Sequence, residues 1–203
     1  MSWSIPIIKL VNSSKDQLCT SHRPVVRHID SVQLLKEYAL GERHFDGVCL
    51  KYAHLFEVEL HDISLQYADL SEAYLPYTNF SYGQLHGLKL ESSEVGDSLF
   101  YKADLGCTIL CHSRLHRCNL RGANLRKANL QGAILYRADL TGADLTGADL
   151  TDVDLTGAIL HQASLEGAVL SGTTLFRTLG ANLAGAKLDQ RTILPDGYRP
   201  ELP

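Results

Sequence analysis

The sequence predicts an all-β fold whose backbone turns once every five residues, and two registers in the chain support this prediction. From Phe45 to Leu175 every fifth residue is a large apolar side chain, which gives 27 consecutive positions without a gap. Two residues before each of these positions the chain prefers a small residue, as at Ala53 and Ala68. A helix repeats its apolar face roughly every 3.6 residues and a strand about every 2, so neither regular element fits.

Each five-residue unit is therefore interpreted as one short extended side that ends in a turn. Glycine often stands two residues after the large apolar position, as at Gly122, Gly132 and Gly142, where it can take a positive φ at little steric cost. Four such sides would close a square coil of about twenty residues, and stacked coils would pair edge to edge. The other three positions of each unit would face outward.

The predicted core combines the two registers. The large inward residues include Phe45, Phe80, Phe100, Leu125, Leu130, Leu135, Leu140, Leu145 and Leu150. The small inward residues include Ala123, Ala128, Ala133, Ala138, Ala143 and Ala148.

The run from Ala123-Asn124-Leu125 to Ala148-Asp149-Leu150 resembles the pentapeptide-repeat family, whose pattern is A(D/N)LXX. The looser pattern covers about two-thirds of the chain. The resemblance implies a right-handed quadrilateral β-helix, in which residues 43–177 would form about seven coils. At ~4.8 Å between paired strands, this column would be about 32 Å long. The lead-in from Tyr38 to Phe45 also resembles that of family members from photosynthetic bacteria.

The flanks are expected to cap the open ends of this column, because its stability comes from stacking between neighbours. Within the N-terminal segment 1–42, Asp30 as N-cap, Gln33 as in a capping box and Gly41 as a stop predict a capping helix near 31–40. Its apolar stripe would be Val32, Leu35, Tyr38 and Ala39. Upstream, residues 5–11 are apolar enough for a strand, whereas residues 12–23 are polar.

The five-residue phase breaks near the C-terminus. Leu183 follows Leu175 by eight residues, which suggests a small insertion near residues 177–180. Residues 178–203 are expected to form a phase-shifted final half coil and a C-terminal cap.

Composition predicts a soluble, cytoplasmic single domain, monomeric or weakly dimeric. The chain has 203 residues, 45% hydrophobic and 21% charged, with no apolar run near the ~18–20 residues of a membrane span. Its first residues lack the features of a secretory signal. We therefore expect no membrane association.

Motifs for chemistry are largely missing, so we expect no enzyme, no cofactor and no metal site. The sequence contains no CxxC, HExxH, GxSxG or phosphate-binding loop. Cys107, Cys111, His112 and His116 could be written as a metal site, but the fold would scatter them over different sides. The aspartates at 139, 144, 149 and 154 would likewise lie on four successive sides.

The net charge of −4 is arranged in bands. Residues 42–104 sum to −7, residues 105–138 to +6 and residues 139–154 to −5. The basic band contains Arg114, Arg117, Arg121, Arg126, Lys127 and Arg137, with Tyr136 alongside. It is either ordinary surface charge or a docking belt for an acidic protein surface. Nucleic acid is disfavoured, because the flanking acidic bands would repel phosphates.

A second outward feature is a set of tyrosines, each two residues after a large apolar position and each on a different side. They are Tyr52, Tyr67, Tyr77 and Tyr82. Such side chains recur at protein interfaces, but they could equally shield the corners of the coil.

The sequence favours a rigid protein-binding module with a regulatory or scaffolding role, whose pre-ordered surface reduces the entropy lost on binding. The family resemblance also implies an alternative, a DNA-mimic inhibitor of a topoisomerase such as gyrase. That role needs a continuously acidic surface, which the +6 band interrupts. A structural protein without a dedicated partner is the third possibility.

Overall fold

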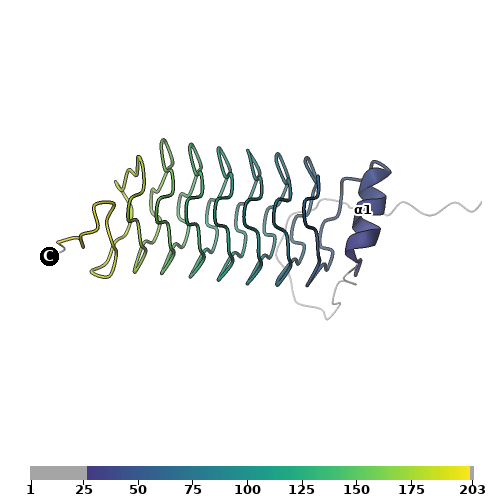
Figure 1. The fold of residues 1–203 in the computed structure, drawn as a ribbon, viewed down its shortest axis with the longest axis horizontal. Coiled ribbons are helices and arrows are strands. Elements are labelled where there is room, and N and C mark those ends of the chain that lie inside the picture. The colour runs from purple at the N-terminus through teal and green to yellow at the C-terminus, as the bar shows by residue number, and fades with distance from the viewer. Residues whose placement is uncertain (1–26, 202–203) are drawn as a thin grey trace, which may run out of the picture.

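Residues 27–201 are described by a computed structural model, so the segments 5–11 and 12–23 lie outside the described residues. Figure 1 shows a column of stacked coils with α1 (Ser31–Ala39) across one end and the C-terminus at the other. Within residues 27–201, no helix is both long and apolar enough to cross a membrane.

Parallel bridges set the register of the stack. From His44 to Ile159, each bridge residue pairs with the residue twenty places later, and the bridge residues follow one another every five residues. A coil of twenty residues therefore carries four bridges, one for each five-residue side. Each side spends most of its residues on a β-turn, so residues 27–201 contain isolated bridges and no longer strand.

Every main-chain N–H of a regular repeat is hydrogen-bonded, as residues 143–147 show. The bonds run from Ala143 N to Leu140 O (2.9 Å), Asp144 N to Ala123 O (3.0 Å), Leu145 N to Ser164 O (2.9 Å), Thr146 N to Asp144 Oδ1 (2.9 Å) and Gly147 N to Glu166 O (2.8 Å). Three of these five bonds reach the coil before or after. The aspartate before the large residue accepts the one donor that the backbone leaves open.

The second residue after each large apolar position takes a left-handed conformation, whether or not it is glycine. Every fifth residue from Gly47 to Arg177 has φ between 53° and 69°, and eighteen of these 27 residues carry a side chain. The turn closes by a bond such as Ala53 N to Leu50 O (3.0 Å), which fits a type II turn. Except at Gln162, the N–H of this residue is also bonded to the next coil, which holds even Tyr52 in place (3.1 Å to Ser71 O).

The core forms one continuous hydrophobic cluster along the column. The fifteen large and small inward residues named from the sequence are each at most 1% exposed. Phe80 and Phe100 stack across adjacent coils with ring centroids 5.3 Å apart. Most hydroxyls that replace alanine donate to a main-chain carbonyl. The acceptor lies in the preceding coil for Ser98 Oγ (Leu75 O, 2.7 Å) and in the same turn for Thr108 Oγ1 (Leu105 O, 2.7 Å).

The helix α1 meets the column with a different face from the predicted one. Asp30 caps it by accepting a hydrogen bond from Gln33 N at 2.8 Å, but the Gln33 side chain binds Glu37 instead of completing a capping box. The predicted stripe is wrong at Val32, which is 75% exposed, whereas Leu34 is fully buried.

The buried face of α1 begins one residue earlier than the predicted stripe. Leu35 and Tyr38 do pack partly against the core, while Ala39 is exposed. Ser31 contacts the first coil, because its Oγ accepts a hydrogen bond from His54 N at 3.1 Å. The helical period that starts at Ser31 therefore places Leu34, Leu35 and Tyr38 against the column.

The expected insertion near residues 177–180 is wrong. Leu179 still pairs in register with Ile159, but Val169 then pairs with Lys187, eighteen residues later, and Thr174 with Ile193, nineteen later. The last coil is thus shorter than the others. The eight residues that separate Leu175 from Leu183 correspond to two five-residue sides from which two residues are missing. It pairs along three sides, which is more than the expected half coil.

Asp189 ties this shortened coil to the one before it. Its carboxylate accepts hydrogen bonds from Gly172 N (2.9 Å), Arg191 N (3.0 Å) and Thr192 N (3.0 Å). The bond from Gly172 N and those from Arg191 and Thr192 lower the pKa of Asp189 to about 2.

We predict that Asp189 makes the protein sensitive to acid. Its folded pKa lies below the unfolded value of about 3.9, so its stabilising effect is present above about pH 4 and is lost as pH falls toward about 2. Asp189→Asn should flatten the dependence of the melting temperature on pH in this window, whereas Glu201→Gln should not. Thermal melts followed by circular dichroism between about pH 2 and pH 7 would check this. An equal fall in melting temperature at low pH in the wild type and in Asp189→Asn would contradict it.

Glycines at the corners let side chains from an adjacent coil lie across them. Gly47 and Gly87 occupy the same corner two coils apart, with φ of 66° and 65°. A Cβ at Gly87 would lie 2.5 Å from Tyr67 Cδ1, whereas a Cβ at Gly47 would meet nothing within 4 Å.

We predict that Gly87→Ala destabilises the fold more than Gly47→Ala. The left-handed backbone should reduce the free energy of unfolding by about 1 kcal/mol in both variants, and only Gly87→Ala must also displace the Tyr67 ring. Denaturant unfolding measures the difference, and Tyr67→Ala combined with Gly87→Ala should remove it. Equal losses in the two single variants would show that the ring moves freely.

Candidate protein-binding surface

Backbone hydrogen bonds align the corner residues of successive coils into four edges. On one edge, Glu57 N donates to Pro76 O (3.1 Å), Tyr77 N to Gly96 O (3.2 Å) and Arg117 N to Tyr136 O (2.9 Å). We call this the Tyr77 edge. It consists of the residue pairs 56–57, 76–77, 96–97, 116–117, 136–137, 156–157 and 176–177.

The predicted basic belt runs around the column and does not form one surface. Arg117, Tyr136 and Arg137 lie on the Tyr77 edge, and Arg114 belongs to the side that leads into it. Arg121 is one corner further on, and the pair 126–127 lies two corners away, on the opposite edge. No single flat partner can contact all six cations.

Four of the six cations in the belt are paired with carboxylates of adjacent coils. The pairs are Arg114 with Glu94 (3.2 Å), Arg117 with Asp97 (2.6 Å), Arg121 with Asp139 (3.4 Å) and Arg126 with Asp144 (2.9 Å). Exposed pairs of this kind contribute about 1 kcal/mol at most to stability. The basic band is therefore largely neutralised by the acidic bands on either side.

The remaining two cations differ. Within residues 27–201 neither Lys127 nor Arg137 has a carboxylate partner, and the Arg137 guanidinium lies 5.1 Å from the centre of the Tyr136 ring. Arg117 instead binds Asp97 through Nε and Nη2 (2.7 and 2.6 Å). These hydrogen bonds hold the pKa of Asp97 below its ordinary value. Of the two belt cations on the Tyr77 edge, Arg137 is thus the one without a carboxylate partner in the described part of the chain.

The four tyrosines are each at least half exposed but occupy four separate corners. Tyr67 meets His86 (ring centroids 5.7 Å apart) and Tyr82 meets Tyr101 (5.5 Å), so they also cover neighbouring corners. Tyr77 alone among the four shares an edge with Arg117 and Arg137.

An aromatic cluster that the sequence interpretation did not assemble surrounds Tyr77. We define the aromatic cluster as His54, Phe56, Tyr74 and Tyr77. Phe56 stacks on Tyr74 (6.2 Å, 15° between planes), Tyr77 meets Phe56 edge-on (5.7 Å, 78°), and His54 lies 5.7 Å from Tyr74. Writing the sequence twenty residues to a row would have placed these residues side by side.

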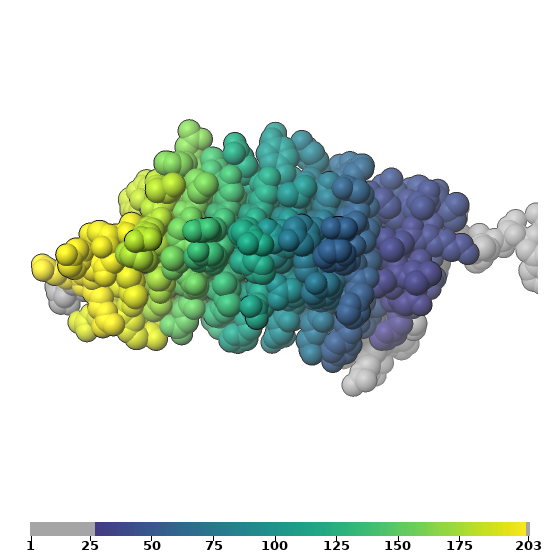
Figure 2. Space-filling model, in the orientation of Figure 1, coloured from purple at the N-terminus to yellow at the C-terminus, as the bar shows by residue number. Residues whose placement is uncertain are grey.

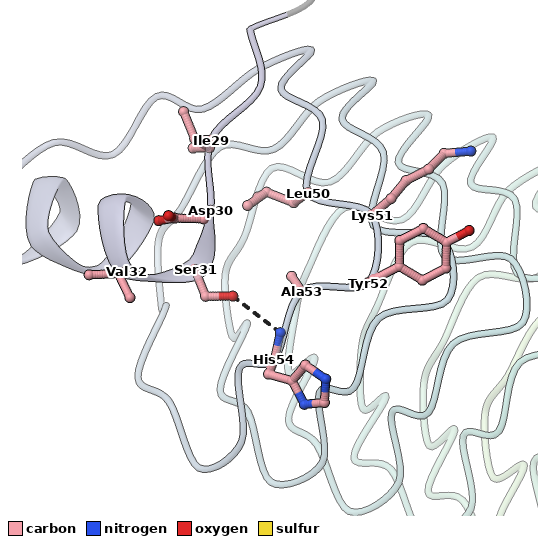
Figure 3. Close-up of a pocket in the computed structure, with 9 residues that line it drawn as sticks. All are labelled: Ile29, Asp30, Ser31, Val32, Leu50, Lys51, Tyr52, Ala53 and His54. Atoms are coloured by element: carbon pink, nitrogen blue, oxygen red, sulfur yellow. Dashed lines mark hydrogen bonds between the residues drawn. The ribbon is translucent and has the colours of Figure 1, made fainter.

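A hollow lies between the start of α1 and the first coil. It measures about 480 Å³, and Ile29, Leu50 and Ala53 of the core line it. Figure 3 shows Lys51 and Tyr52 extending away from the helix, so their polar groups do not converge on the hollow. Small-molecule sites usually combine an apolar cavity with convergent polar groups, which this hollow lacks.

The cysteines and histidines of residues 27–201 do not gather into a metal centre. Cys107 is exposed, whereas Cys118 is buried in the core, and burial raises the pKa of its thiol to about 12. No group of three or more His, Cys, Asp or Glu side chains within residues 27–201 is placed to hold a metal ion. The face drawn in Figure 2 is a continuous convex surface without a deep cleft. Outward side chains on such a surface suit contact with another macromolecule.

Comparison with known proteins identifies the repeat. A model of pentapeptide repeats matches eight copies over residues 53–91, 97–132 and 133–172. Among solved structures, HetL from the cyanobacterium Nostoc sp. strain PCC 7120, a pentapeptide repeat protein involved in heterocyst differentiation regulation, is 30% identical. The match covers 85% of this chain and all of HetL, with a TM-score of 0.54.

Two further pentapeptide repeat proteins match less well in structure. One from Nostoc PCC 7120 is 27% identical over 83% of this chain and 100% of its own (TM-score 0.30). One from the thylakoid lumen of Arabidopsis thaliana is 32% identical over 45% of this chain and 54% of its own (TM-score 0.30). No curated protein sequence matches the chain. The repeat model spans more than half of the chain and HetL is matched over its whole length, so this chain belongs to the pentapeptide repeat family.

Proposed function

We propose that this protein is a non-enzymatic, cytoplasmic protein-binding module with a regulatory or scaffolding role, and that its partner contacts the Tyr77 edge. The observation that carries the proposal is the fixed grid of side chains on that edge. Main-chain bonds at Tyr77, Arg117 and Arg137 hold each of these residues to the next coil. A partner would bind side chains whose backbone is already ordered, which reduces the entropy lost on binding.

The proposed architecture is the right-handed quadrilateral β-helix of the family, with about seven coils in residues 43–177. Residues 1–42, through α1, and residues 178–203 would cap its two ends. Capped ends leave the outer faces and edges as the surfaces for binding.

The likeness to HetL supports a regulatory role. HetL is described as involved in the regulation of heterocyst differentiation, and the match covers its whole length. The likeness extends to the fold and to 30% of the aligned residues, so the partner of this chain is inferred from its own surface.

DNA mimicry is less well supported than a protein-binding module. A mimic needs carboxylates that are free to imitate phosphates. Here Asp139 and Asp144 each use one oxygen to close a turn and the other to bind an arginine of the basic band. Two of the five carboxylates of the acidic band 139–154 are therefore engaged by the basic band and are not free to imitate phosphates.

We predict that Arg137→Glu abolishes capture of the partner and that Lys127→Glu does not. Both residues lack a carboxylate partner within residues 27–201 and both have φ of 55°, but they lie on opposite edges. Affinity capture from a lysate of the source organism, followed by mass spectrometry, compares each variant with the wild type. Melting temperatures should stay within a few degrees, because both side chains are exposed.

Arg117 is a poor choice for this experiment. Its reversal would place a new glutamate beside Asp97 and remove the cation that Asp97 binds, so it would change stability as well as binding. Loss of capture with Lys127→Glu alone would move the binding site to the opposite edge. Identical capture by both variants and the wild type would remove the Tyr77 edge from the proposal.

A further inference from the structure

Among residues 46–177, three of the four phenylalanine or tyrosine residues at the first position of a corner are covered by a cation from the following residue. Tyr101 is followed by Lys102, Tyr136 by Arg137 and Phe176 by Arg177. The cation lies 5.3, 5.1 and 4.9 Å from the respective ring centre. Because a cation above a ring face is attracted to the π electrons, the chain satisfies each of these rings itself.

The fourth such residue, Phe56 on the Tyr77 edge, is followed by an acidic residue instead of a cation. Phe56 occupies the same corner position as Tyr136 and Phe176, but the residue that follows it is Glu57. Phe56 is 48% exposed and its neighbours Tyr74 and Tyr77 are 41% and 51% exposed. Among residues 27–201, no cation lies over any of these three rings.

Cations near this part of the column are engaged elsewhere. Arg43 lies 3.8 Å from the centre of the Tyr38 ring, Lys51 pairs with Asp69 (3.6 Å), and Arg117 is held by Asp97 (2.6 Å). None of them is free to move onto Phe56 without breaking a contact. Within residues 27–201, the aromatic cluster therefore has exposed π faces that no arginine or lysine covers.

Carboxylates beside the aromatic cluster also lack a cationic partner. Within residues 27–201 Glu57 has no hydrogen bond or ion pair from a side chain, and Glu59 accepts only from the Asn79 amide (2.6 Å). Residues 42–104 carry a net charge of −7. Ring faces and uncompensated carboxylates together form a surface that favours a cation and disfavours an anion.

We propose that the aromatic cluster, with Glu57 and Glu59, binds an arginine- or lysine-bearing segment of the protein partner. The partner's cation would lie above the Phe56 ring, as Arg137 lies above the Tyr136 ring and Arg177 above the Phe176 ring. Arginine should bind better than lysine, because its planar guanidinium stacks on a ring while pairing with a carboxylate. This inference rests on the proposed function and names the chemistry of the partner.

The test uses a fluorescein-labelled peptide of alternating glycine and arginine, with glutamate in place of arginine as the control peptide. Fluorescence anisotropy at about 0.15 M salt, where long-range charge effects are screened, measures binding to the wild-type protein and to two variants. Glu57→Arg would let the chain cover Phe56 itself, as it does at Phe176. Glu72→Arg makes the same change in charge at an equivalent position on another edge, with φ of 59° against 54° at Glu57.

The arginine peptide should bind the wild type and the glutamate peptide should not. Glu57→Arg should weaken binding about tenfold, through loss of one cation–π contact and one ion pair, and Glu72→Arg by about twofold or less. Both should fold, since arginine already occupies this conformation at Arg117, Arg137 and Arg177. Phe56→Leu, which keeps an apolar residue but removes the ring, should also weaken binding.

Two outcomes would overturn the inference. Equal losses in Glu57→Arg and Glu72→Arg would mean that the peptide responds only to net charge, and no binding to the wild type would mean that the cluster is no cation site. Neither outcome removes the proposed function, which is tested separately by capture with Arg137→Glu. Loss of capture there, together with unchanged peptide binding in Glu57→Arg, would keep the binding module and reject a basic partner segment at the aromatic cluster.

Discussion

The rest of this structure depends on one constraint, which is that a chain turning every five residues must still find acceptors for its buried and half-buried main-chain N–H groups. Buried or half-buried donors without partners are strongly unfavourable. In the regular repeat, one donor closes the β-turn, three reach adjacent coils, and the last is accepted by the aspartate or asparagine before the large residue. The A(D/N)LXX pattern thus records hydrogen bonding as well as packing.

The same constraint explains which parts of the fold could be predicted from the sequence. The inward positions could be predicted from the sequence, because only apolar residues of two sizes fit the interior, as Leu145 and Ala143 do. The left-handed backbone at Tyr52 or Arg117 could not be predicted, since it is stabilised by a main-chain hydrogen bond to the next coil and not by the residue type. The face of α1 and the shortened last coil depend on packing at the two ends, where the five-residue rule no longer applies.

Prediction of the candidate site was limited for a related reason. The sequence identified Arg117, Arg137 and Tyr77 as outward, but charge bands along a chain are not charged surfaces. Because each coil returns after twenty residues, a band of about that length encircles the column, and its neighbours in space are the bands before and after it. Arg126 therefore meets Asp144, and the belt that seemed free in sequence is mostly paired.

Functional residues in such a column are best sought at outward positions where the sequence departs from its usual pattern and where the main-chain hydrogen bonds do not restrict the side chain. The side chains two residues after the large positions are free to vary, because their backbone is held whatever they are. A cation after an exposed ring lets the chain cover that ring, so a carboxylate there gives up an intramolecular contact. The Phe56 ring packs against Tyr74 and Tyr77 of the next coil, but among residues 27–201 the cation that the chain places over such a ring elsewhere is missing here, and another molecule must supply the positive charge.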